Sequence, residues 1–164
     1  MLWNLVGYGA FVLIIVGVLW EKYRNILLTV GAATLALYAA LFLENELFTV
    51  LQMMIVTSGL LQLLQCPRKT SAFVISIFAV VACVMLLVHG AIASAYDILG
   101  GLGLMGIAFG VAFLPARNAF VLMTGGGVLM VVYAFSASAW VFFFLNIFFA
   151  IANIKTLYST KIHR

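Results

Sequence analysis

Residues 20–46 read WEKYRNILLTVGAATLALYAALFLENE, a long apolar run between two charged clusters. The cluster before the run contains Lys22 and Arg24, and the cluster after it contains Glu44 and Glu46. The run itself carries no charge and is close to the roughly 20 residues that cross a bilayer as one helix. We therefore predict a membrane-spanning helix with one basic end and one acidic end.

The rest of the chain continues this pattern with six more apolar stretches. The chain is 67% hydrophobic and 7% charged, whereas an average soluble domain has roughly 25% charged residues. Runs such as 141–151 do not alternate between apolar and polar residues, as the strands of a membrane β-barrel do. We predict an all-α integral membrane protein with seven transmembrane helices, at residues 2–20, 26–43, 47–65, 71–88, 95–114, 119–135 and 139–156.

Basic and acidic residues occupy different gaps between the predicted spans. All eight Lys and Arg residues fall in the first, third and fifth gaps and in the C-terminal tail. Because basic loops stay in the cytoplasm during insertion, this pattern predicts an N-terminus outside and a C-terminus inside the cell. The net charge of +4 then lies at one membrane face, where it favours contact with membrane lipids and not with nucleic acid. The compact loops favour a bacterial inner (plasma) membrane.

The spans also suggest an internal repeat of three helices, one connecting helix and three helices (3+1+3). The second span of each unit has a glycine followed seven residues later by a tyrosine, and the third span has an amide side chain. The matching residues are Gly31 and Gly126, Tyr38 and Tyr133, and Gln52 and Asn146. The predicted divisions are a first unit at 1–66, a linker helix at 67–94 and a second unit with a short basic tail at 95–164. The alternative is a chance likeness among apolar helices.

In this architecture the chain resembles the SWEET sugar transporters and the related PQ-loop proteins and nicotinamide-riboside carriers. SWEETs line a central pocket with Asn residues on the third helix of each unit and aromatic residues on the second helix. The resemblance implies that Asn146 and Gln52 contact a solute, with Tyr133 and Tyr38 beside them. The chain differs from SWEETs in having no Pro-Gln pair and no proline within a predicted helix.

Asn146 is the strongest candidate from the residues themselves, because it lies in the middle third of the last predicted span. An unsatisfied polar group in hydrocarbon costs several kcal/mol, so this amide needs a partner. Asn153 lies two helical turns further along the same face, and Gln52 is similar on the third span. Each amide either contacts a solute or joins two helices by hydrogen bonds. Tyr38 and Tyr133 lie near outer helix ends, as gate residues or as part of an interfacial aromatic belt.

The predicted spans hold no acid or base at mid-membrane, where ion-coupled carriers usually have an ionisable group. We find no cluster typical of a metal site, a cofactor site or an enzyme. The expected function is facilitative, uncoupled transport of a small neutral polar solute such as a sugar or vitamin precursor, without cofactor or metal. The alternative is a non-catalytic membrane subunit that packs in a larger complex or binds lipid or quinone. A homo-oligomer or a membrane-complex partner stays open for both functions.

Overall fold

The computed structural model describes residues 2–162, with side chains from residue 5 to residue 158. Within these residues it contains seven α-helices and no strand. The helices are α1 (Leu2–Leu19), α2 (Arg24–Tyr38), α3 (Glu46–Leu63), α4 (Arg68–Val88), α5 (Ala95–Ala112), α6 (Arg117–Ser136) and α7 (Trp140–Ile162). A 3-10 turn, η1 (Glu21–Tyr23), precedes α2, and a π-helical turn, η2 (Ala39–Leu43), follows it. The predicted all-helical fold with seven apolar helices is confirmed.

Six of these segments are long and apolar enough to cross a membrane: Glu21–Leu43 and the helices α3 to α7. The described apolar part of α1, Leu5–Leu19, is shorter. This composition is that of a multi-pass membrane helical protein. The helices follow the predicted spans closely, and the largest difference is α7, which continues to Ile162 beyond the predicted end at residue 156.

Short turns connect the helices, and several of them are capped by polar side chains. Asn45 caps the start of α3, because its side-chain oxygen accepts a hydrogen bond from the Phe48 N–H at 2.9 Å. Ser94 and Asp97 form a capping box at the start of α5. The Ser136-Ala137-Ser138 cluster separates α6 from α7, as predicted, and Ser138 has a left-handed backbone with φ 53°. Turns this short place successive helices antiparallel.

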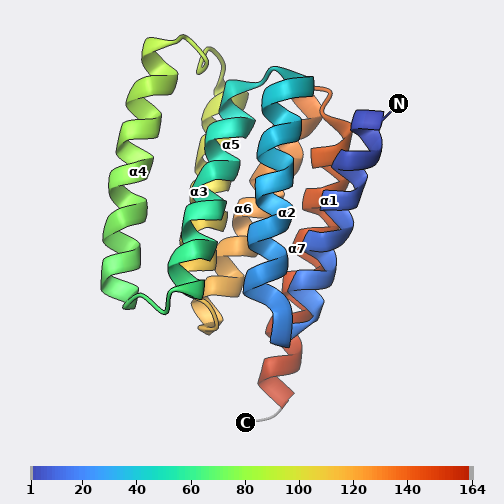
Figure 1. The fold of residues 1–164 in the computed structure, drawn as a ribbon, viewed down its shortest axis with the longest axis vertical. Coiled ribbons are helices and arrows are strands. Elements are labelled where there is room, and N and C mark those ends of the chain that lie inside the picture. Colours follow the sequence, from blue (N-terminus) through green and yellow to red (C-terminus); the bar gives the residue numbers. More distant parts are fainter. Residues whose placement is uncertain (1, 163–164) are drawn as a thin grey trace.

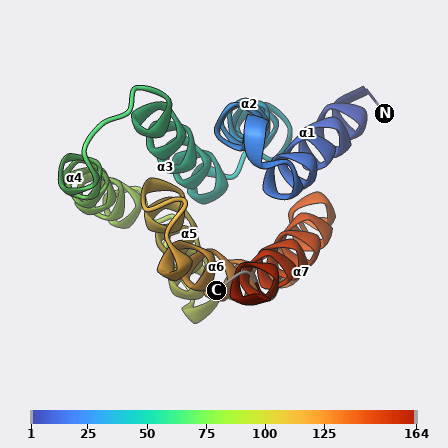
Figure 2. The ribbon, with the colours of Figure 1, turned by 90° about the horizontal axis from the view of Figure 1, so that it is seen from below.

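Six helices form a closed ring in the order α1, α2, α3, α5, α6, α7 and back to α1 (Figure 2). The helix α4 stands outside this ring, and its main contacts among the described residues are with α3 and α5 (Figures 1 and 2). The ring encloses the buried core, and it puts α2 and α6 on opposite sides. A site inside the ring can therefore collect side chains from both halves of the chain.

Charged residues separate to the two ends of the bundle. The end that holds the C-terminus, at the bottom of Figure 1, also holds the α1–α2, α3–α4 and α5–α6 connections. We call it the basic end, because it carries Lys22, Arg24, Arg68, Lys69 and Arg117. The opposite, acidic end carries Glu44, Glu46, His89 and Asp97, and an ion-pair contact of 3.2 Å joins the His89 ring to Glu46.

The helices α5 and α6 approach each other closely through glycines. The Gly126 backbone lies against the carbonyl oxygen of Gly103, and a methyl group added at Gly126 would also lie 2.9 Å from the Ile107 nitrogen. Both neighbours are backbone atoms that cannot rotate away. The Gly125-Gly126-Gly127 run therefore packs within a continuous α6 and does not unwind it.

Gly126→Ala is expected to destabilise the protein by about 1–3 kcal/mol, the usual cost of overpacking. Gly125→Ala is the matched control, because a methyl group there has nothing within 4 Å and helix propensity favours Ala over Gly by up to about 1 kcal/mol. Thermal unfolding in detergent, followed by circular dichroism, measures both. Equal melting temperatures for the two variants would contradict the close helix contact.

Candidate functional site

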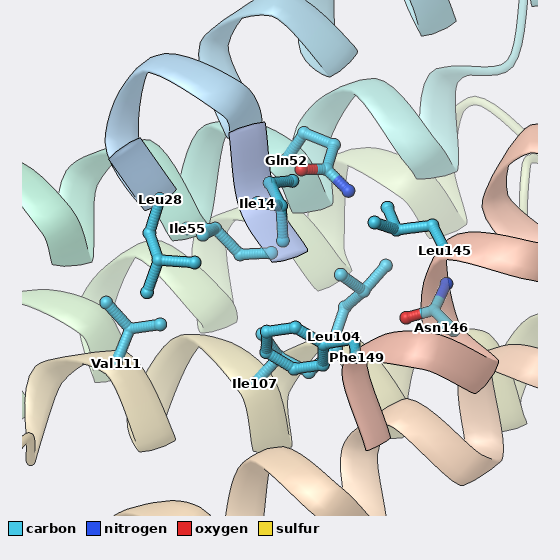
Figure 3. Close-up of a pocket in the computed structure, with 10 residues that line it drawn as sticks. All are labelled: Ile14, Leu28, Gln52, Ile55, Leu104, Ile107, Val111, Leu145, Asn146 and Phe149. Atoms are coloured by element: carbon cyan, nitrogen blue, oxygen red, sulfur yellow. The ribbon is translucent and has the colours of Figure 1, made fainter. Parts of the chain in front are cut away.

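A small cavity of about 20 Å³ lies inside the ring (Figure 3). This space is sufficient for about one water molecule. Two of its ten lining residues are polar, Gln52 from α3 and Asn146 from α7. The others are apolar: Ile14, Leu28, Ile55, Leu104, Ile107, Val111, Leu145 and Phe149. The structure thus brings together the two amides that the sequence singled out, although 93 residues separate them in the chain.

Gln52 has a buried amide oxygen without a partner. The residue is 3% exposed, and its Oε1 atom accepts no hydrogen bond from the described residues. A buried acceptor left unsatisfied costs about 1–3 kcal/mol. Figure 3 shows the Gln52 carboxamide among the side chains that line the cavity, with its nitrogen and not its oxygen turned towards Asn146. The neighbouring side chains cover this acceptor, so a molecule in the cavity reaches it only if they move.

The two asparagines of α7 bond back to their own helix. Asn146 Nδ2 donates to the Phe142 carbonyl at 2.7 Å, and Asn153 Nδ2 donates to the Phe149 carbonyl at 2.8 Å. Neither of these bonds joins two helices. They therefore give no support to the interpretation that these amides hold neighbouring helices together. Asn146 lines the cavity, whereas Asn153, although fully buried, does not.

Four aromatic side chains fill the interior of the helix ring on the side of the cavity that faces the acidic end. Phe48 and Phe142 stack with their centroids 4.1 Å apart. Tyr133 packs on Phe48 at 4.9 Å, and Tyr38 lies 6.3 Å from Phe142. Phe48 and Phe142 each precede a cavity amide by one helical turn, on helices that begin at the acidic end. We call these four residues the aromatic cluster.

Tyr38 and Tyr133 therefore do not line the cavity but contribute to the aromatic cluster that covers it. Each is only 3% exposed, which contradicts the interpretation of these two tyrosines as an interfacial belt. The Tyr133 hydroxyl accepts a hydrogen bond from Asn45 Nδ2 at 3.3 Å. This bond joins the end of α6 to the turn before α3, a contact that the sequence analysis missed.

Arg24 fills the ring interior at the basic end. It is 6% exposed, and its guanidinium lies 5.2 Å from the centre of the Phe120 ring on α6. It donates to the Val18 carbonyl at the end of α1 at 3.3 Å. Leu28, one turn further along α2, already lines the cavity. From the charge pattern alone, Arg24 is one of the bases of the first loop, although its spacing from Leu28 puts both residues on one helix face.

Several contacts occur twice, once in each half of the chain. A methyl group added at Gly7 of α1 would meet the Tyr38 ring at 3.2 Å, and one added at Gly100 of α5 would meet the Tyr133 ring at 2.6 Å. Gly31 faces the Ala10 carbonyl oxygen just as Gly126 faces that of Gly103. The aromatic cluster is likewise made of two tyrosine–phenylalanine pairs, with the phenylalanines stacked on each other.

Comparison with known protein families, curated proteins and solved structures gives no match to this chain. The arguments about function consequently depend on the cavity and its surroundings. Among the residues that the structure describes, no group of three or more His, Cys, Asp and Glu side chains is arranged to hold a metal ion.

Proposed function

We propose that this chain is a facilitative membrane transporter for a small neutral polar solute, and that the solute binds in the central cavity. The observation that carries the proposal is the unpartnered, buried carboxamide oxygen of Gln52, a residue that lines the same cavity as Asn146. A buried polar atom without a partner is costly to keep. A transported solute that supplies the missing hydrogen bond gives a reason for keeping it.

We further propose that the ring consists of two three-helix units, 1–66 and 95–164, with the linker helix at 67–94 between them. The contacts that occur twice support this division. They match Gly7 with Gly100, Gly31 with Gly126, and the Tyr38–Phe142 pair with the Tyr133–Phe48 pair. A solute site between two like-oriented repeats is a common arrangement in transporters, and it is the one that the SWEET resemblance implies.

The cavity in this proposal is an occluded solute site. The aromatic cluster closes it towards the acidic end, and Arg24 with Phe120 closes it towards the basic end. A solute larger than a water molecule requires the surrounding helices to move apart, as in alternating access. By the distribution of bases, the basic end faces the cytoplasm of a bacterial cell. Asn153 lies two turns beyond Asn146 towards that end, on the path of departure.

The chemistry of the lining selects a neutral solute moved without an ion gradient. None of the ten lining residues is an acid or a base, and coupled carriers usually need an ionisable group within the membrane. Two amides among eight apolar side chains can satisfy a few hydroxyl or amide groups. A charged solute would remain unpaired there, at a high cost in free energy.

Asn146→Ala is expected to reduce solute uptake into proteoliposomes by about tenfold, the effect of losing one hydrogen bond of about 1.4 kcal/mol. The assay uses a panel of radiolabelled neutral metabolites that includes sugars and vitamin precursors. Asn118→Ala is the control, because Asn118 is an exposed amide in the first turn of α6. Equal uptake by wild type and Asn146→Ala would remove Asn146 from the site. No uptake of any solute would instead favour the membrane-subunit function.

A further inference from the structure

Arg24 is the only buried base among the Lys and Arg side chains that the structure describes. Lys22, Arg68, Lys69, Arg117 and Lys155 are all exposed. Long basic side chains at a membrane face normally extend their charge into water. Arg24 instead turns into the ring, and its Nε atom has no hydrogen-bond partner among the described residues. Its position therefore needs an explanation beyond the orientation of the chain in the membrane.

The geometry places the guanidinium across the ring. Arg24 is the first residue of α2, and its guanidinium lies over the phenyl group of Phe120 on α6. The helix α6 is on the opposite side of the helix ring from α2 (Figure 2). The Val18 carbonyl at the end of α1 holds its Nη2 atom from a third helix. One side chain thus links α1, α2 and α6 at the basic end, one helical turn from the cavity residue Leu28.

The charge of Arg24 is poorly neutralised. Its only carboxylate contact among the described residues is Glu21 at 3.6 Å, and the Glu21 side chain is 81% exposed. Solvent screens such a pair strongly, so it contributes little. An arginine cannot lose its proton at any physiological pH. The basic end of the ring therefore has a permanent positive charge buried between α1, α2 and α6.

We infer that Arg24 is the charge-selective barrier at the basic end of the transport route, which excludes cations and lets neutral solutes pass. A fixed arginine in a channel wall rejects cations electrostatically. Contact with Phe120 holds the guanidinium across the route in the occluded state. When α2 and α6 separate, the guanidinium stays on α2 at the wall of the opened route, where its charge repels cations. This inference rests on the proposed transport function and names the residue that sets its charge selectivity.

The test measures access to the cavity from the basic end. Val111 is a lining residue in the last turn of α5. The substitution Val111→Cys is made in a protein whose two native cysteines are removed by Cys66→Ser and Cys83→Ala, so that one thiol reports access to the cavity. Two membrane-impermeant methanethiosulfonates of similar size, one cationic and one anionic, are added to inside-out vesicles. With Arg24 present, the anionic reagent is expected to label Cys about tenfold faster than the cationic reagent, the effect of a unit charge roughly 10 Å away.

Three variants separate the charge of Arg24 from its stacking. Arg24→Gln is expected to remove the preference for the anionic reagent, and Arg24→Lys is expected to keep it. Phe120→Leu keeps the guanidinium but removes the aromatic group on which it packs. Both reagents should then label the introduced cysteine faster, and the anionic reagent should still react faster than the cationic one. Arg117→Gln is the control, because it removes an exposed charge from the same end.

Loss of the preference in Arg24→Gln alone supports the barrier. The inference is overturned if Arg24→Gln still reacts faster with the anionic reagent, or if Arg117→Gln loses this preference equally. It is also overturned if the cysteine introduced at position 111 is never labelled from the basic end. If Arg24→Gln does not fold, the barrier is supported when Arg24→Lys keeps the preference and Phe120→Leu raises both labelling rates, and it is overturned when either effect is missing. The labelling needs no transported solute, so failure of the barrier and failure of the uptake assay are distinguishable.

Discussion

Phe142→Ala is expected to lower the free energy of unfolding by about 3–5 kcal/mol, the usual range for a buried aromatic residue. Phe142 is fully buried and stacks on Phe48 with an interplanar angle of 17°. It also lies beside Tyr38. Its removal leaves a cavity between the two halves of the helix ring that the remaining aromatic side chains cannot fill.

Phe144→Ala is the matched control, because Phe144 lies on the same helix but is 45% exposed. Its loss is expected to have a much smaller effect. Unfolding in mixed micelles with increasing denaturing detergent, followed by tryptophan fluorescence, measures both variants. A similar loss of stability for Phe142→Ala and Phe144→Ala would mean that the aromatic cluster does not hold the halves together.

Gln52→Leu is expected to stabilise the protein and to reduce uptake. The substitution removes a buried oxygen without a partner, so the gain is up to about 1–3 kcal/mol. The same change removes a polar contact for the solute, and uptake should fall by about tenfold or more. Opposite effects on stability and activity are typical of a residue kept for function.

Gln62→Leu is the control for the sign of the stability change. Gln62 lies on the same helix, and its Nε2 atom donates to the Ala112 carbonyl of α5 at 2.6 Å. Its replacement leaves that carbonyl without this partner and should destabilise the protein by about 1 kcal/mol. Thermal unfolding and uptake are measured on both variants. A destabilised Gln52→Leu protein with normal uptake would make Gln52 a structural residue.

The number and positions of the helices could be predicted well, because bilayer thickness limits the length of each span and charged residues mark its ends. The pairing of Gln52 with Asn146 could also be predicted, since each is a strongly polar residue in the third helix of its predicted unit. Their amides face one cavity in the structure. Their role in solute binding stays a prediction.

The inward face of each helix could not be predicted from hydropathy. In a membrane protein the lipid-facing side is as apolar as the core, so apolar residues do not distinguish the two. Tyr38 and Tyr133 therefore fitted an interfacial belt as well as a gate, and only their burial separates the two interpretations. Arg24 was missed for a related reason: a base at a helix end fits the orientation rule whether or not it is buried.

The π-helical turn at Ala39–Leu43 gives the acidic end a place where a small local change has a large effect. A π turn bonds i to i+5, whereas an α turn bonds i to i+4. Rewinding this turn by one residue would rotate the following backbone by roughly 100°. Asn45 would then swing away from the Tyr133 hydroxyl that it now bonds at 3.3 Å. In the proposed transport cycle, a change of winding in these five residues would release the closure at the acidic end, while every helix of the ring stays straight.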